Sequence, residues 1–363
     1  MLGWLTRFAR RPALLVFACI FAVVSATLFA PAVSGATSAS FAGMSPQRAG
    51  MAELMRSYNP STGLIGNNWW QAAVAQSTLE TYQETTGFAG YRGVIATAFR
   101  DHKSGNFEDA YNDDTGWWGL AWLQAYVMTG DKPYLRMAET DADYIHQSWT
   151  RTCGGGVWWS TARTYKNAIP NELFLELAAW LHNVIPGDSK YLDWANAEWN
   201  WFQSSGMINK SDEINDGLTA QCANNHKTTW TYNQGVLLAG LAQLYKATNN
   251  RALLLSAEDI GQAAIHHLTI GGVLHEPCRG DQCGNNTDDD PQSFKGIFVQ
   301  DLKVLAVTAR TNEFSGFFRK QAQEIEVHDT DWHHQLGMFW SGPTAGRTSY
   351  SQASAEAALV AAA

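Results

Sequence analysis

Apolar segments of helical length alternate along the chain with short polar turns. Three of these turns, TGDKPYLRMAE, PGDSKYLDWAN and TNNRALLLSAE, match position by position at residues 129–139, 186–196 and 248–258. A looser copy begins at Thr311. Each turn places Gly or Asn before Asp, Asn or Glu, residues that end one helix and cap the next. The pattern therefore predicts a helix–turn–helix unit that recurs about every 60 residues.

These helical hairpins predict an all-α fold, closed into a barrel of six hairpins. We favour closure over an open solenoid because the units are longer than solenoid repeats usually are, and because the connections between hairpins are long. With the helices that follow the turns, the total is about twelve. β structure should be limited to a short hairpin near Gly155–Ser160. The other helices are expected at residues 45–58, 69–86, 117–128, 171–184, 234–246, 294–309 and 349–361.

The long connections between hairpins carry most of the unusual side chains. In a barrel of hairpins, the tight turns lie at one end and the connections at the other, so residues in the connections converge on one face. This convergence predicts a functional site there. The residues concerned are Trp69-Trp70, Asp113-Asp114, Trp158-Trp159, Tyr165, Trp230–Tyr232 and Phe294.

The N-terminal segment is typical of a secretory signal peptide. Three arginines precede an apolar stretch at residues 13–30 and the small residues Ser34-Gly35-Ala36. We expect cleavage after Ala36, with an uncleaved membrane anchor as the alternative. Residues 37–363 should then form one domain, because no linker interrupts them. The expected location is extracellular or in a cell wall.

Charge narrows the class of ligand. Removal of residues 1–36 deletes three arginines and no acid, which takes the formal net charge from −9 to −12. An acidic protein is a poor partner for nucleic acid, whose phosphates require clustered Lys and Arg. A neutral ligand such as a glycan fits better.

Cysteines and sequons agree with secretion. Of five cysteines, Cys19 lies in the signal segment, and four remain in an oxidising compartment. Four cysteines allow three connectivities; we pair Cys278 with Cys283 across a short loop, which leaves Cys153 with Cys222. Two N-glycosylation sequons, which indicate surface loops, begin at Asn209 and Asn285.

No metal or cofactor is expected. The neighbouring histidines His266-His267 and His333-His334 lack the i, i+4 spacing that places two ligands on one face of a helix. The run Asp288–Asp290 lacks the alternating ligands and central glycine of a calcium loop, so a solvated N-cap is the better interpretation.

The strongest candidate for chemistry is the pair Asp113-Asp114, within the run YNDDTGWWGLAWLQAY at residues 111–126. Taken alone, the dipeptide is better explained as a helix N-cap. Adjacent carboxylates repel, however, and ionising both beside bulky aromatics costs free energy. An ionised carboxylate next to one whose pKa is raised supplies the nucleophile and the proton donor that glycoside cleavage requires.

Four segments of the predicted face combine aromatics with carboxamides or carboxylates. Aromatic rings cover the C–H face of a sugar, while planar polar groups bind vicinal hydroxyls. Ordinary helix capping above packed tryptophans would explain any one of them, but four on one face favour a sugar site. They are NNWWQ (67–71), YNDDTGWW (111–118), TYKNAIPNELF (164–174) and TTWTYNQG (228–235).

Longer motifs resemble a known family. YNDD followed by GWWGLAWLQAY, then YKNAIPNELFLELAAWL, YLDWANAEWNWF, TYNQGVLLAGLAQLY and FKGIFVQDL, is similar to the secreted fungal members of glycoside hydrolase family 76, the α-1,6-mannanases. The likeness covers essentially residues 37–363 in order. It implies an (α/α)6 barrel and endo-hydrolysis of α-1,6-linked mannan with retention of configuration.

The resemblance also divides the roles of the aspartates. It implies that Asp113 attacks the anomeric carbon and that Asp114 is the general acid/base. Neighbouring residues at a helix start can reach the separation of about 5 to 5.5 Å that retention requires. We expect eight further residues to line the mannan groove: Trp70, Trp117, Tyr165, Asn171, Tyr232, Asn233, Gln234 and Lys295.

Two other functions remain open. Membrane-anchored relatives of this family are thought to transfer mannan-bearing glycolipid anchors to wall glucan, so a cell-wall transglycosidase is the first alternative. A non-catalytic glycan-binding wall protein is the second. The presence of both Asp113 and Asp114 beside aromatics argues against loss of catalysis.

Overall fold

The computed structural model describes residues 43–277 and 290–363, which belong to one compact unit at Ala39–Ala363. The expected signal segment lies outside the described residues, as do Cys278, Cys283 and Asn285. None of the helices in the part of the chain that is described is long and apolar enough to cross a membrane.

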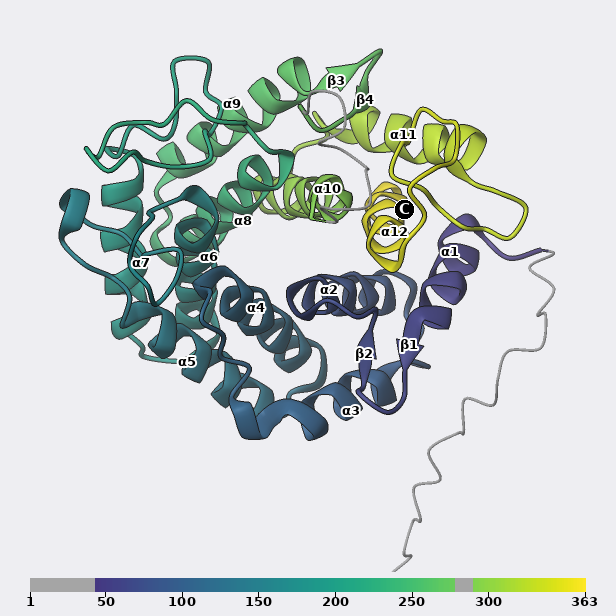
Figure 1. Ribbon diagram of the computed structural model, residues 1–363, viewed down its shortest axis with the longest axis horizontal. Coiled ribbons are helices and arrows are strands. Elements are labelled where there is room, and N and C mark those ends of the chain that lie inside the picture. The colour runs from purple at the N-terminus through teal and green to yellow at the C-terminus, as the bar shows by residue number, and fades with distance from the viewer. Residues whose placement is uncertain (1–42, 278–289) are drawn as a thin grey trace, which may run out of the picture. The chain divides into compact units, whose positions relative to one another are not determined.

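Six helices form the inner ring of a closed barrel (Figure 1). Each inner helix packs against the next one in the chain, and α12 packs against α2, which closes the ring. The predicted all-α barrel of six hairpins is therefore confirmed. The inner helices are α2 (Trp69–Thr86), α4 (Asn112–Thr129), α6 (Ala168–Val184), α8 (Thr231–Thr248), α10 (Pro291–Ala309) and α12 (Ser349–Ala362).

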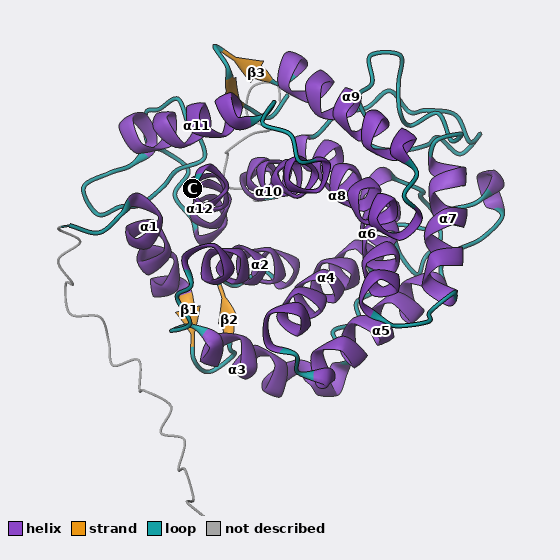
Figure 2. Cartoon of the chain, turned by 180° about the vertical axis from the view of Figure 1, so that it is seen from behind, coloured by secondary structure: helices purple, strands orange, loops and turns teal. Residues whose placement is uncertain are grey.

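Six outer helices surround this ring, and the view from behind shows the same two layers (Figure 2). They cover the outside of the inner ring and bury one face each. In α5, buried residues such as Tyr134, Met137, Ala138 and Ile145 recur with helical spacing. The outer helices are α1 (Pro46–Leu54), α3 (Arg92–His102), α5 (Lys132–His146), α7 (Lys190–Phe202), α9 (Arg251–His267) and α11 (Ser315–Glu324).

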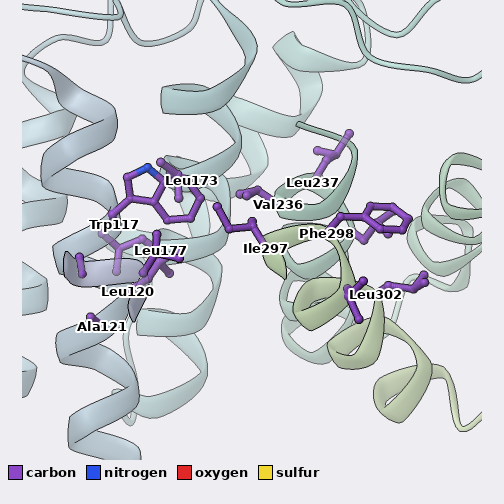
Figure 3. Packing of buried hydrophobic residues seen from close by; sticks show 14 of the residues in the cluster. Trp117, Leu120, Ala121, Leu173, Leu177, Val236, Leu237, Ile297, Phe298 and Leu302 are labelled. Atoms are coloured by element: carbon purple, nitrogen blue, oxygen red, sulfur yellow. The ribbon is translucent and has the colours of Figure 1, made fainter. Parts of the chain in front are cut away.

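The inner helices are buried on nearly every side, and their side chains form the core between the layers. Figure 3 shows part of this core, contributed by α4, α6, α8 and α10. Two glycines permit the closest approaches between neighbouring inner helices. A Cβ on Gly235 would lie 2.5 Å from Cα of Phe298, and one on Gly296 would lie 2.4 Å from Cα of Ser354. The ring can therefore close at this radius only with glycine at these positions.

The predicted turn chemistry joins the helices of each hairpin. Gly130 and Asn249 end α4 and α8 in the left-handed conformation, and the side chain of Asn250 accepts a hydrogen bond from Ala252 N at the start of α9. Arg310 ends α10 in the same conformation. These turns lie at the C-terminal ends of the inner helices, so the long connections lead to their N-terminal ends.

β structure is confined to two short antiparallel hairpins within the described ranges. The expected hairpin near Gly155–Ser160 is wrong. This segment forms single bridges instead, because Val157 pairs with Trp149, just after α5, and Ser160 pairs with Tyr111, the N-cap residue of α4. The strands are β1 (Tyr58–Asn59) paired with β2 (Leu64–Ile65), and β3 (Thr269–Ile270) paired with β4 (Val273–Leu274).

Candidate active site

A cleft with a volume of about 290 Å³ lies at the N-terminal ends of the inner helices. Residues from α2, α4, α8 and α10 reach it, together with residues of the connections that precede α2, α4, α6 and α10. The convergence expected from the hairpin pattern therefore brings distant segments into one site. The lining residues are Asn68, Trp70, Tyr111, Asp113, Asp114, Trp117, Trp159, Tyr232, Asp290 and Phe294.

Asp113 and Asp114 occupy the first turn of α4, and Tyr111 is the N-cap residue. The helix start is held by the connection between α5 and α6. Asn112 donates its backbone N–H to Trp159 O (2.8 Å) and its side-chain amide to Trp158 O (2.7 Å). The two aspartates therefore follow a residue, Asn112, that is held by the connection between α5 and α6.

The environment of Asp113 both raises and lowers its pKa. The net pKa is raised to about 7, and burial, which removes water from the carboxylate, is the largest cause of the rise. Trp159 Nε1 donates to Asp113 Oδ2 (3.0 Å), and the backbone N–H groups of Asp113 and Asp114 act in the same direction, so these donors lower the pKa. The charge of Asp290 raises it again. Asp113 is thus the member of the pair with donors that favour the ionised form.

Asp114 has the opposite balance. Burial raises its pKa first, and the negative charges of Asp113, Asp109 and Asp290 raise it further, to about 8. No donor lowers it. The pair therefore favours an ionised Asp113 and a protonated Asp114, the arrangement of a nucleophile next to a proton donor.

Aromatic rings form the walls of the cleft. The rings of Trp70 and Trp117 stack with centroids 5.8 Å apart, and Tyr232 stacks on Phe294 at 3.8 Å. Tyr111 packs on Trp159 at 4.7 Å. These apolar faces beside carboxyl groups can hold a sugar ring in the way expected from the sequence.

Asp290 is a cleft residue that was not predicted from the sequence. It occupies the N-cap position of α10, as expected for the run Asp288–Asp290, and its carboxylate accepts a hydrogen bond from Trp70 Nε1 (3.2 Å). Its place beside Asp113 and Asp114 depends on the packing of α10 near α2, which no local signal shows. Four other lining residues were not among the candidates: Asn68, Tyr111, Trp159 and Phe294. All four carried a signal: Trp159 and Phe294 fall in or beside the connections, and Asn68 and Tyr111 lie in the segments 67–71 and 111–118 that combine aromatics with polar side chains.

Two predicted groove residues hold connections in place instead of lining the cleft. Asn171 accepts a hydrogen bond from Val157 N (2.5 Å) and donates to Val157 O (3.0 Å) and Asn167 O (2.7 Å). Gln234 accepts from Ile214 N (2.8 Å) and donates to Ile214 O (3.0 Å). Each buried amide thus pairs with both the backbone N–H and the C=O of one loop residue, as a neighbouring strand would do.

Three more predicted residues lie away from the lining. Tyr165 packs edge-to-face on Trp159, donates to Asp216 Oδ2 and accepts from Asn225 Nδ2 (2.8 Å). Lys295 is buried over the ring of Trp340 and donates to Met338 O, and Asn233 is buried as well. Among the eight groove candidates, the structure places Trp70, Trp117 and Tyr232 in the cleft.

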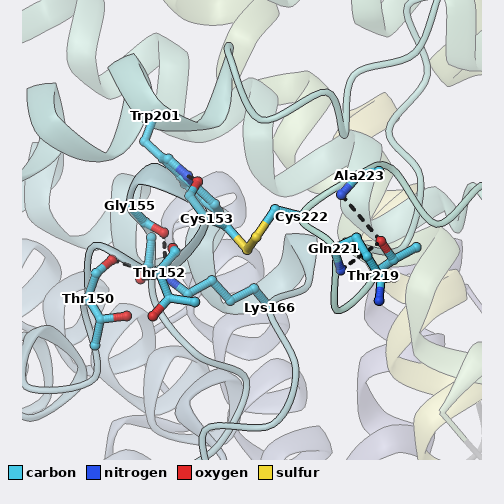
Figure 4. The surroundings of a disulfide bond; sticks show 11 residues. Thr150, Thr152, Cys153, Gly155, Lys166, Trp201, Thr219, Gln221, Cys222 and Ala223 are labelled. Atoms are coloured by element: carbon cyan, nitrogen blue, oxygen red, sulfur yellow. Dashed lines mark hydrogen bonds between the residues drawn. A yellow bond between two sulfur atoms is a disulfide. The ribbon is translucent and has the colours of Figure 1, made fainter.

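A disulfide joins Cys153 to Cys222, as paired from the sequence (Figure 4). Beside it, the ammonium of Lys166 donates to the carbonyl oxygens of Thr150 (3.1 Å), Thr152 (2.8 Å), Gly155 and Gly156 (2.8 Å). This loop leads directly to Trp158 and Trp159.

The sequon asparagine Asn209 lies in a turn. Its side chain accepts from Ser211 N (2.8 Å) and donates to Asn215 Oδ1 (3.1 Å). No group of three or more His, Cys, Asp or Glu within residues 43–277 and 290–363 is arranged to hold a metal ion.

A closed barrel of six helical hairpins with paired carboxyls in an aromatic cleft defines a glycoside hydrolase of the (α/α)6 class. The sequence model of glycosyl hydrolase family 76 matches residues 44–363. The chain therefore belongs to this family.

Similar proteins have been characterised in fungi and bacteria. The chain is 28% identical to the mannan endo-1,6-alpha-mannosidase DFG5 of Candida albicans, over 69% of this chain and 62% of the relative. It is 31% identical to the corresponding DFG5 protein of Saccharomyces cerevisiae, over 66% and 57%. The chain thus spans about three-fifths of the length of the curated relatives it matches.

Solved structures share the fold. The α-1,6-mannanase of Salegentibacter sp. HEL1_6 superposes with a TM-score of 0.78 at 24% identity, covering 87% of this chain and 98% of that one. Dfg5 of Chaetomium thermophilum, solved with glucosamine, gives a TM-score of 0.76 at 20% identity, covering 87% and 88%.

Proposed function

We propose that this protein is a secreted, retaining, endo-acting glycosidase that hydrolyses α-1,6-mannosidic bonds in mannan of the fungal cell-wall type. The observation that carries the proposal is the unequal environment of two adjacent carboxyls. Asp113 has donors that favour its ionised form, whereas Asp114 is surrounded by negative charge that favours its protonated form.

In the first step, Asp113 attacks the anomeric carbon while Asp114 protonates the leaving glycosidic oxygen. Positive charge develops on the sugar ring, and the buried carboxylate of Asp113, together with Asp290, stabilises this charge. Asp114 is then ionised and removes a proton from water, which attacks the mannosyl-enzyme and releases Asp113. The two inversions give retention of configuration.

The relatives support the substrate. The curated relatives carry the name mannan endo-1,6-alpha-mannosidase. An inactive variant of the Salegentibacter mannanase, in which two consecutive aspartates are replaced by asparagine, was solved with α-1,6-mannotriose. The same adjacency in Asp113-Asp114 supports α-1,6-mannan as the substrate of this chain.

The test compares the wild type with Asp113→Asn and Asp114→Asn on linear α-1,6-mannan. Loss of the general acid should lower kcat by roughly 10²- to 10⁴-fold, and loss of the nucleophile should abolish turnover. Asp131→Asn is the matched control, because Asp131 precedes a helix at the other end of the barrel and is exposed. Unchanged hydrolysis in either of the first two variants would refute the assignment.

Product analysis tests the mechanism and the reaction type. NMR of the first-formed sugar should show the α-anomer, and β-mannose as the first product would contradict retention. An acceptor oligosaccharide added at low concentration should leave hydrolysis products dominant. Transfer products in excess under these conditions would identify the protein as a transglycosidase.

A further inference from the structure

A second cavity, lined by both apolar and polar side chains, opens at the opposite end of the barrel from the cleft. Its volume is about 310 Å³, close to the 290 Å³ of the cleft. It is lined by the C-terminal halves of the inner helices, and we call it the distal chamber. Its charged, amide and aromatic lining residues include Gln124, Glu176, Trp180, Gln243, Lys246, Gln300, Asp301 and Lys303.

Two carboxyls face the distal chamber without a partner. Glu176 of α6 is 5% exposed and Asp301 of α10 is 8% exposed. Neither makes a hydrogen bond or an ion pair with another described residue, although both line the chamber and a small inner cavity of about 50 Å³ beyond it. Burial raises the pKa of both groups. Buried carboxyls normally have hydrogen-bond partners, so these two are arranged to receive them from a ligand.

The lining indicates the chemistry of that ligand. Trp180 offers an aromatic face, and the carboxamide of Gln300 offers a donor and an acceptor for vicinal hydroxyls. Gln124 and Gln243 offer one free atom each, because Gln124 Nε2 already donates to Thr81 and Glu84 and Gln243 Oε1 already accepts from Asn183. The C-terminal ends of helices favour groups that donate hydrogen bonds. The lining carries charges of both signs, Lys246 and Lys303 together with Glu84, Glu176 and Asp301, which suits a neutral ligand better than a strongly charged one.

We propose that the distal chamber binds a neutral mono- or disaccharide, at a second site that is separate from the cleft. Hydroxyl groups of the sugar donate to Glu176 and Asp301, and one ring face packs on Trp180. Trp117 lines both the cleft and the small inner cavity, so this side chain separates the two sites along the barrel. A polymer cannot thread past it, which restricts the distal ligand to short saccharides.

The test is calorimetric titration of the non-hydrolysing Asp113→Asn/Asp114→Asn double variant. The probes are α-1,6-mannobiose, chosen because of the proposed function, and maltose, which does not depend on it. We expect binding of mannobiose at two sites. Adding Gln300→Leu should weaken one of them about tenfold or more and leave the other unchanged. Gln300 makes no hydrogen bond to other described residues, so this variant should fold normally, and Gln203→Leu on the surface is the control.

Trp180→Ala is a second, independent variant, and it should weaken the same site. A single binding event that neither substitution alters would overturn the proposal, provided that both variants retain the wild-type melting temperature. Stoichiometric binding of CaCl₂ with no saccharide binding at this end would also overturn it, in favour of a cation site. Hydrolysis of mannan by the wild type is measured in parallel. If the double variant shows no distal binding while the wild type hydrolyses mannan normally, only this inference is refuted. If distal binding is present but the wild type does not hydrolyse mannan, only the proposed function is refuted.

Discussion

The hydrogen bond from Trp159 to Asp113 should set the acidic limb of the pH profile. Trp159→Phe keeps the ring that packs on Tyr111 but removes the donor at 3.0 Å from Oδ2. Because this donor favours the ionised carboxylate, its loss raises the pKa of Asp113. The nucleophile must be ionised, so activity is then lost at a higher pH as the medium is acidified.

The size of this effect follows from the charge on the acceptor. A hydrogen bond to a charged group contributes about 1.5–3 kcal/mol, and about 1.4 kcal/mol corresponds to one pKa unit. The acidic limb of log kcat/KM should therefore move up by about one to two pH units. The same rise narrows or closes the interval between the pKa of Asp113, about 7, and that of Asp114, about 8, so the maximum of kcat/KM should also fall.

The assay is initial-rate hydrolysis of α-1,6-mannan across the pH range for the wild type, Trp159→Phe and Trp158→Phe. Trp158 is the matched control, because its indole N–H is buried and makes no hydrogen bond within the described residues. We expect no movement of the acidic limb in this control. A Trp159→Phe enzyme with the wild-type melting temperature and an unmoved acidic limb would refute the reasoning.

Three further changes test the site and its support. Asp113→Asn removes the charge that raises the pKa of Asp114, so that pKa should fall, as a carboxyl ¹³C NMR titration would show; an unchanged or raised pKa would contradict the coupling. Gly296→Ala forces a Cβ against Ser354 and should lower the free energy of unfolding by about 1–3 kcal/mol in urea melts, and equal stability would count against the close approach. Lys166→Met leaves several buried carbonyls without a donor and should lower the melting temperature, whereas an unchanged value would show that the loop needs no cation.

The helices could be predicted, and the aspartate pair could be singled out, because their signals are local. The helix expected at residues 69–86 is α2 with the same bounds, since Asn68 caps it and Gly87 ends it in the left-handed conformation. The barrel followed from the recurrence of such units. The aspartate pair was recognisable for the same reason, because both carboxyls and their tryptophans lie within a few residues of one another.

The rest of the site depends on contacts between distant segments. The side-chain amide of an Asn or Gln near a helix start can face either a ligand or the connecting loop before the helix. The sequence does not distinguish these two orientations. Asn171 and Gln234 both turn to the backbone of a loop. Asp290 shows the converse case, because it joins the cleft only through the packing that brings α10 to Trp70. The interpretation of Asp113 and Asp114 as a cap was close in position, but Tyr111 is the N-cap residue.

The separation of roles within the pair follows from the geometry of a helix start. Successive residues on an α-helix point about 100° apart, so neighbouring carboxyls enter different surroundings although their backbones touch. Asp113 meets the indole of Trp159, while Asp114 meets the negative charges of Asp109 and Asp290. The charge of Asp290 raises the pKa of both Asp113 and Asp114, which makes ionisation of both members of the pair unfavourable. In the proposed mechanism, positive charge on the sugar relieves this repulsion as the bond breaks, so the excess of carboxyls would stabilise the transition state more than the bound substrate.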